Sequence, residues 1–174
     1  LDHGPGLIAM DKGCEGGMLV RPFRFFRSPA PTAEASRRRF AQHGSFDTHF
    51  NQPPLHIKLW TDVSRAIGDF FDDLKEHDAG DNLIMMLFTE FGRRVQDNGT
   101  GTDHGAGGVA FVIGNQVKGG MYSTYPSVRP EDLTQGDLAP NYDFRGFYST
   151  VVERWLGLDA VPIVGGKFEQ LDFV

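Results

Sequence analysis

Apolar and polar positions alternate with helical spacing between residues 55 and 75. The apolar residues recur at steps of three and four positions: Leu55, Leu59, Val63, Ile67, Phe70 and Leu74. Charged side chains occupy most of the positions between them, which is typical of an amphipathic helix of about five turns. The helix is expected to end near the stretch HDAGD, where Gly80 can take the left-handed conformation that ends many helices.

Two apolar runs follow this helix, and both are typical of strands. Residues 82–89 read NLIMMLFT, an almost unbroken apolar stretch, and residues 109–113 read VAFVI. Short apolar runs bounded by turn residues suit strands that are buried on both faces, as in a parallel sheet. We therefore expect both runs to lie inside the domain.

A second helix is expected towards the carboxyl end. Asp143 is a suitable N-cap, and apolar residues keep helical spacing from Phe144 to Leu158. The order helix, strand, loop, strand, helix with buried strands predicts a layered α/β domain, which we place at residues 44–174.

Residues 1–43 have a different composition. Six arginines and one acidic residue, Glu34, lie between Arg21 and Arg39, and several prolines accompany them. This composition predicts a poorly ordered or rebuilt amino-terminal arm. An arm that meets an anionic partner or a membrane surface is the alternative.

Composition and charge narrow the class of protein. A chain of 174 residues with 40% apolar residues and 15 Phe is expected to form one domain with a packed core. The net charge of -6 argues against a nucleic-acid binder, and the single Cys14 excludes an intramolecular disulfide. We find no apolar run of the ~18 residues that a membrane span needs and no signal peptide, so localisation stays open.

Two Asp/His pairs are the strongest candidates for chemistry. Asp103 and His104 are adjacent in the glycine-rich stretch GTDHGAGG, where close approach of other groups is easy. Asp47 and His49 are two residues apart, so an extended backbone turns both side chains the same way. Imidazole and carboxylate together are a natural ligand set for a divalent cation. The pairs therefore predict a metal site.

Two further polar residues follow the first apolar run. Glu90 and Arg93 come directly after the expected strand, at its carboxyl end. Ligands of open α/β sheets bind beyond the carboxyl ends of the strands, so we expect both residues near the metal site. A simple ion pair at the start of a helix is the alternative interpretation of Glu90 and Arg93.

Three stretches closely resemble the carboxy-terminal part of a bacterial family of uncharacterised proteins, DUF1501. They are GSFDTHFNQ, TEFGRRVQDNGTGTDHGAGGVAFVIGNQVKGGMY and DFRGFYSTVVERWLG, and the resemblance covers about residues 44–174. The family is grouped with the alkaline phosphatase and sulfatase superfamily, and its members are often exported. The resemblance implies an alkaline phosphatase-like α/β/α sandwich, here as the carboxy-terminal half of the fold.

The same resemblance implies the metal ligands. Asp47 and His49 would bind one metal position, and Asp103 and His104 would bind the other. Zn²⁺ is the ion that the superfamily commonly uses, with Mn²⁺ or Ca²⁺ as alternatives.

The resemblance also implies roles for the other two residues. Glu90 would be an accessory acidic ligand or a general base, and Arg93 would neutralise an anionic group of the substrate. The chain departs from the superfamily pattern in three ways. The half that carries the superfamily nucleophile is not matched, SRRRFAQH stands where a strand is expected before the first motif, and no His follows His104.

These features predict a metal-dependent hydrolase that uses water activated by the metal, with Glu90 or His49 accepting the proton. Phosphate or sulfate esters are the substrates that the resemblance implies. Carboxylic esters or small lactones are the alternative, because positive charge near the site is limited to Arg93 and Arg94. A non-catalytic relic stabilised by a metal, or an interaction module, is the other class. We also expect self-association into a homo-oligomer, which would cover exposed sheet surface.

Overall fold

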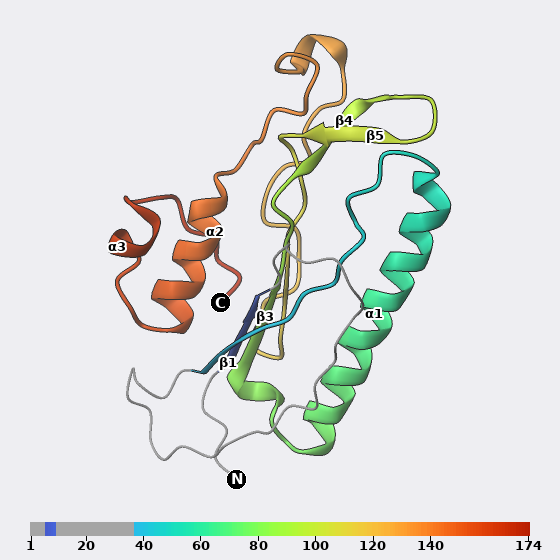
Figure 1. Ribbon diagram of the computed structural model, residues 1–174. Coiled ribbons are helices and arrows are strands. Elements are labelled where there is room, and N and C mark those ends of the chain that lie inside the picture. The colour runs from blue at the N-terminus through green and yellow to red at the C-terminus, as the bar shows by residue number, and fades with distance from the viewer. Residues whose placement is uncertain (1–5, 10–36) are drawn as a thin grey trace.

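A computed structural model describes residues 6–9 and 37–174 (Figure 1). Its main sheet has four strands in the order β2-β1-β3-β6. Their bounds are β1 Gly6–Ala9, β2 Arg37–Phe40, β3 Leu83–Leu87 and β6 Phe111–Ile113. Strand β1 is parallel to both β2 and β3, whereas β6 is antiparallel to β3. The sheet is therefore mixed.

Strand β3 carries the core on both of its faces, as its apolar run predicts. Leu83 and Met85 belong to one cluster of buried side chains, and Ile84 and Met86 belong to a second cluster. Successive side chains of a strand point to opposite faces, so each cluster covers one face of the sheet. The prediction of a strand buried on both faces is confirmed.

Helix α1 (Gln52–Glu76) covers the first face of the sheet (Figure 1). Its apolar stripe buries Leu59, Val63 and Leu74, and Leu74 packs in the cluster with Leu83 and Met85. The helix matches the segment that the periodicity predicts. Two prolines at its first positions suit the start of a helix, where a backbone N–H has no helical partner.

The end of α1 differs from the expectation. Asp78, and not Gly80, takes the left-handed backbone conformation, with a φ of 50°. Asp visits this conformation more readily than most residues. Gly80 instead begins a short 3-10 helix, Gly80–Asn82, where a Cβ atom would lie 2.8 Å from the Nδ2 atom of Asn115. Gly80 therefore does not terminate the helix.

The second face of the sheet is covered by the carboxy-terminal part of the chain. Helix α2 (Phe144–Thr150) continues into a π-helical segment, Val151–Trp155, and α3 (Val161–Val164) follows. As expected, Asp143 caps α2, because its side chain accepts a hydrogen bond from the backbone N–H of Arg145. Helices thus lie on both faces of the sheet, which gives an α/β architecture (Figure 1).

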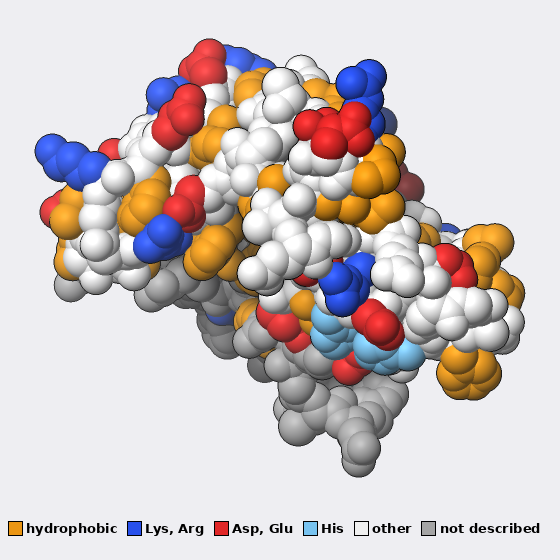
Figure 2. All heavy atoms as spheres, turned by 90° about the horizontal axis from the view of Figure 1, so that it is seen from above, with side chains coloured by type: hydrophobic (Ala, Val, Ile, Leu, Met, Phe, Trp, Pro, Cys, Tyr) orange, Lys and Arg blue, Asp and Glu red, His pale blue; other side chains and the backbone are white. Residues whose placement is uncertain are grey.

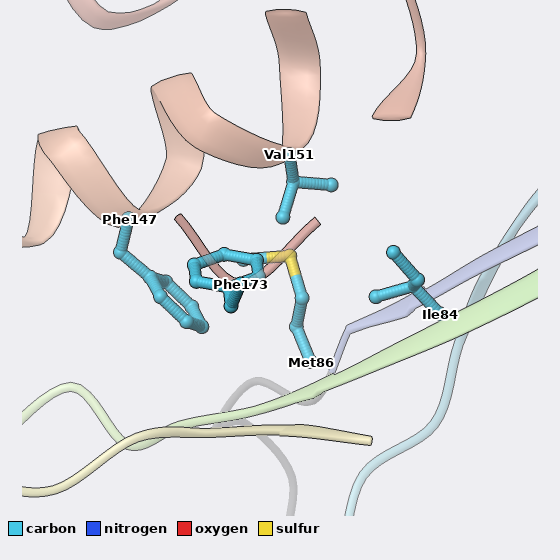
Figure 3. Close-up of a cluster of buried hydrophobic side chains, with 5 residues drawn as sticks. All are labelled: Ile84, Met86, Phe147, Val151 and Phe173. Carbon is cyan, nitrogen blue, oxygen red and sulfur yellow. The ribbon is translucent and has the colours of Figure 1, made fainter. Parts of the chain in front are cut away.

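The ring of Phe173 lies in the core of this second face. Phe173 is 2% exposed and packs with Ile84 and Met86 of β3 and with Phe147 and Val151 (Figure 3). The carbonyl oxygen of Phe173 also accepts a hydrogen bond of 2.8 Å from the backbone N–H of Lys118. Aromatic and aliphatic side chains from three distant segments therefore fill this layer.

A separate two-stranded sheet lies beside the start of α1 (Figure 1). Its strands are β4 (Gly92–Asp97) and β5 (Thr102–Gly105), which pair in antiparallel fashion. The glycine-rich stretch that was expected to be a loop thus supplies a strand. The β4–β5 hairpin requires Gly92, since a Cβ atom there would lie 1.8 Å from the carbonyl oxygen of Gly107.

The second apolar run behaves differently from β3. Only its last three residues form a strand, β6, and that strand lies at the edge of the sheet, where Phe111 is 42% exposed. The prediction of a second buried strand is therefore wrong. An edge strand has one neighbour only, so its side chains stay partly open to solvent.

The segment 1–43 contributes two strands to the sheet, β1 and β2. The strand β2 falls within SRRRFAQH, where the sequence comparison with the family suggested that a strand was missing. The sheet therefore begins before residue 44, the expected start of the α/β domain. Two parts of the expected arm, residues 1–5 and 10–36, lie outside the described residues. No helix among the described residues is both long and apolar enough to span a membrane.

Candidate metal centre

Three of the predicted ligands converge on one point. One ligand atom from each of Asp47, His49 and His104 lies within 4.8 Å of the other two. The Oδ1 atom of Asp47 is the focus: it lies 2.7 Å from Nε2 of His104 and 3.2 Å from Nε2 of His49. The two imidazole rings are tilted by 31°, with centroids 4.8 Å apart. Figure 2 shows histidine side chains beside acidic ones on the face seen from above.

Two segments supply these ligands. Asp47 and His49 lie in the extended stretch before α1, and His104 lies in β5 of the hairpin. Gln52, the first residue of α1, joins the two segments, because its backbone N–H donates to the Thr100 carbonyl and its Oε1 accepts from the Thr102 hydroxyl. Its side-chain amide also donates to the carbonyl oxygen and hydroxyl of Thr48. Hydrogen bonds of Gln52 therefore hold the two segments that carry these side chains next to each other.

The arrangement fits a divalent cation. Two nitrogen or oxygen ligands at the usual metal distances lie about 3.0–3.4 Å apart when they occupy neighbouring coordination positions. The distance of 3.2 Å between Asp47 and His49 falls within this range, and the distance of 2.7 Å between Asp47 and His104 is slightly shorter. The side chains of Asp47, His49 and His104 are 43%, 48% and 37% exposed, so solvent reaches the point between them. Three protein ligands with further positions open to solvent are typical of catalytic sites.

The imidazole of His104 is supported by an aromatic ring. The phenyl ring of Phe91 stacks on it, with centroids 3.8 Å apart and planes 10° apart. Phe91 lies four residues after the end of β3, so the stack places the loop after this strand against the site. This stack restricts the rotation of the His104 ring.

Asp103 contacts the centre from outside the three-ligand group. Its Oδ1 atom lies 3.1 Å from Nδ1 of His49 and accepts a hydrogen bond of 3.2 Å from the side-chain amide of Asn98. The contact with His49, and then that with Asn98, lowers the pKa of Asp103 below the usual 3.8. Asp103 is therefore held in its charged form beside His49.

Arg93 is engaged by the protein backbone. Its guanidinium donates to the carbonyl oxygens of Thr102 at 2.7 Å and Phe46 at 2.8 Å. Partial burial lowers the pKa of Arg93 from its usual value, and the charges of Asp47 and Asp103 act in the opposite direction. The side chain thus ties the hairpin to the stretch that carries Asp47 and His49.

Glu90 is exposed and lies between β3 and β4. The group of converging ligand atoms includes neither Glu90 nor Asp103. The roles of Glu90 and Arg93 near a substrate, and the assignment of Asp103 as a ligand, remain predictions.

Two residues that matter to this site were missed from the sequence. Phe91 stacks on His104, and Asn98 binds both Asp103 and the carbonyl oxygen of His49. The stretch DNGTG is a recognisable turn signal and could have pointed to Asn98. Nothing in the local sequence indicates that Phe91 meets an imidazole.

Comparison with known proteins gives one match. A family model described as "Protein of unknown function (DUF1501)" matches residues 31–159. Comparisons with curated proteins and with solved structures gave no match. The matched range contains Asp47, His49, Asp103 and His104.

Proposed function

We propose that this chain, which belongs to the DUF1501 family, is a metal-dependent hydrolase that cleaves ester bonds. The observation that carries the proposal is the convergence of Asp47, His49 and His104, from two separate segments, on a spot of cation size that solvent can reach. Two imidazoles and one carboxylate are a ligand set that suits a divalent cation.

The three side chains would hold one divalent ion, with Zn²⁺ the preferred choice for an imidazole and carboxylate set and Mn²⁺ or Ca²⁺ as alternatives. Such an ion, when bound, polarises an ester oxygen and lowers the pKa of water to about 7. The protein contributes the orientation of the ligands. Phe91 stacks on His104 and Gln52 joins the hairpin to the segment before α1, so the ligand geometry is set before substrate arrives.

Glu90 is the proposed proton acceptor. Both ring nitrogens of His49 already face carboxylate oxygens, which leaves this residue less suited to the role than Glu90. Glu90 is exposed and directly precedes Phe91, whose ring lies against His104. A carboxylate near the site can accept a proton from water and pass it to the leaving group.

The contacts of the arginines support a second class of substrates, which carry little charge. Arg93 donates to two backbone carbonyls, and Arg94 donates to the Gln135 carbonyl and lies 3.4 Å from Asp137. Phosphate and sulfate esters, which superfamily membership suggests, need cationic groups for their oxygens. Carboxylic esters and lactones need only a few donors or one ion for the developing oxyanion. We therefore propose carboxylic esters or small lactones as the second candidate substrates.

We further propose that the fold is alkaline phosphatase-like and that the family belongs to that superfamily. The support is the mixed sheet with helices on both faces and a candidate metal centre beyond the end of β3. A resident Ser, Thr or Cys nucleophile is not part of the proposal.

The experiment compares the protein with its His104→Ala and Asp47→Ala variants. Each is loaded with Zn²⁺, Mn²⁺ or Ca²⁺ and assayed on aryl phosphate, aryl sulfate, aryl ester and lactone substrates. His77→Gln is the matched control, because His77 lies at the other end of α1 and is also exposed. We expect turnover of at least one substrate class in the parent and control proteins and its loss in both ligand variants.

Two results would contradict the proposal. Equal hydrolysis by the parent and both ligand variants would remove the metal centre from catalysis. Binding of one ion without turnover, together with unfolding in chelator, would instead identify a non-catalytic domain that the metal stabilises.

A further inference from the structure

The two ring nitrogens of His49 face different surroundings. Nε2 points to Oδ1 of Asp47, which is also the partner of Nε2 of His104. Nδ1 points to Oδ1 of Asp103 at 3.1 Å. A neutral imidazole carries a hydrogen on one nitrogen and a free lone pair on the other, so the two contacts cannot be of the same kind. One nitrogen donates a hydrogen bond and the other is available to a cation.

The side of the ring where ligands converge is the Nε2 side. There, two imidazoles and one carboxylate meet, and metal centres with open positions use such ligands for Zn²⁺ and other transition metals. On the Nδ1 side, the oxygen that faces His49 also accepts a hydrogen bond from the Asn98 amide, at 3.2 Å. The hydrogen of this N–H carries partial positive charge and occupies one acceptor position of the oxygen, which disfavours a cation there.

Asn98 fixes this arrangement from the hairpin turn. Its side-chain amide donates to the carbonyl oxygen of His49 at 3.0 Å as well as to Asp103. Its side-chain oxygen accepts from the backbone N–H groups of Thr100 and Gly101, so the amide group has a defined orientation. The side chain of Asn98 is thus hydrogen-bonded both to the backbone of His49 and to the carboxylate that faces the ring of His49.

We propose that Asp103 is a positioning residue that accepts a hydrogen bond from Nδ1 of His49, and that Asn98 holds the pair in place. Nε2 of His49 is thereby directed to the same point as Asp47 and His104, and the centre takes one ion with three protein ligands. This inference rests on the proposed metal centre but differs from the expectation that Asp103 binds a second ion. Carboxylates that hold a ligating histidine through its other nitrogen are a recurrent feature of metal sites.

The first measurement is the tautomer of His49 in the metal-free protein. Long-range ¹H–¹⁵N spectra distinguish a protonated Nδ1 from a protonated Nε2, and about pH 8.5 keeps an ordinary imidazole neutral. We expect the hydrogen of His49 on Nδ1 in the parent protein and a mixture of tautomers in Asp103→Ala. Asp97→Asn is the matched control, because Asp97 is an acidic residue of the same hairpin whose Oδ1 accepts from the backbone N–H of Gly99. It should leave the tautomer of His49 unchanged.

The second measurement is Zn²⁺ binding by competition with a chromophoric chelator. We expect one ion per chain in the parent protein, an affinity about 10- to 100-fold lower in Asp103→Ala and Asn98→Ala, and binding abolished in Asp47→Ala. The zinc-bound spectra should show the metal on Nε2 of His49.

Three outcomes would overturn the proposal: a hydrogen on Nε2 of His49 in the metal-free protein, a zinc ion on its Nδ1, or loss of zinc in Asp103→Ala as complete as in Asp47→Ala. The proposed hydrolase fails separately, by lack of turnover in a zinc-loaded protein. If zinc did not bind at all, the tautomer measurement would still decide whether Asp103 positions His49.

Discussion

The phenyl ring of Phe91 lies flat against the imidazole of His104, with ring centroids 3.8 Å apart. Phe91 lies just beyond the buried strand β3, so this contact connects the loop after β3 to a proposed metal ligand. Aromatic pairs of this kind are worth about 0.5–1.5 kcal/mol beyond the area that they bury. Phe91→Leu should therefore weaken Zn²⁺ binding by about two- to twelvefold, measured by competition with a chelator. Phe144→Leu, which changes an exposed ring of α2, is the control, and equal affinities in both variants would mean that the stack does not support the ligand.

His56 should make the stability of the protein depend on pH. Its Nε2 lies 3.0 Å from the hydroxyl of Thr48, and burial, followed by the charge of Arg93, lowers the pKa of His56 below 6.5. The unfolded chain then takes up a proton more readily than the folded one. The contribution of His56 is fully present above pH 6.5 and is lost as the pH falls through the folded pKa.

The measurement combines an NMR titration of His56 with urea unfolding at several pH values. His56→Gln should flatten the fall in the free energy of unfolding on the acidic side of neutrality. A titration midpoint of His56 above 6.5 in the folded protein would show that the sign is wrong.

Two glycines should respond to alanine in opposite ways. Gly92→Ala places a Cβ atom 1.8 Å from the Gly107 carbonyl oxygen, so the hairpin must shift, and we expect loss of zinc binding and a lower free energy of unfolding. Gly68 lies inside α1 with nothing within 4 Å of an added Cβ, and Gly68→Ala should raise stability by about 0.5–1 kcal/mol. Urea unfolding of both variants tests this pair. A stable Gly92→Ala protein with full zinc affinity would contradict the tight packing of the hairpin.

Truncation of Met86, in the layer under α2, should lower the stability of the protein. Met86 is 1% exposed and packs with Phe147, Val151 and Phe173 (Figure 3). Truncation of such a residue to alanine removes buried apolar contacts and leaves a cavity, at a cost of about 2–5 kcal/mol. Met121→Ala is the matched control, since Met121 is 79% exposed and should change stability by less than about 0.5 kcal/mol. Equal unfolding midpoints for the two variants would show that this cluster is not a packed core.

Self-association is expected through the edge at β6. This strand ends the sheet, and the partly exposed ring of Phe111 meets that of Trp60 at a centroid distance of 6.0 Å. An edge strand with exposed apolar side chains is a surface that a second chain can cover. Light scattering over a concentration series should show dimers or larger species, and Phe111→Lys should reduce them. A monomer at all concentrations would refute the expectation.

The elements that the sequence predicts well are those whose signal is local. Helix α1 and strand β3 each carry a continuous pattern, the stripe through Leu59, Val63 and Leu74 and the run from Leu83 to Leu87, and burial follows these patterns. Strand β2 has no such pattern, because Arg37, Arg38 and Arg39 are polar and the strand is defined by its pairing with β1. Strand β6 has an apolar sequence but is only partly buried, because the order of the strands places it at the edge of the sheet.

The candidate site shows the same division. The residue types of Asp47, His49 and His104 were enough to predict a candidate metal site, because few other side chains suit a cation. The contact of Asp103 with His49 depends on the register of the hairpin, which shifts between Arg93 and Asp97. No local pattern encodes that irregularity, so the position of Asp103 beside His49 could not be predicted from spacing.

The place of β1 between β2 and β3 has a consequence for how quickly the chain folds. Residues 6–9 must find partners at 37–40 on one side and at 83–85 on the other, and both pairings are parallel. Closing such long loops costs chain entropy before any pairing is gained, and domains that depend on distant contacts fold slowly. We expect α1 to form early in refolding and the four-stranded sheet to be completed late, when β1 is inserted between β2 and β3.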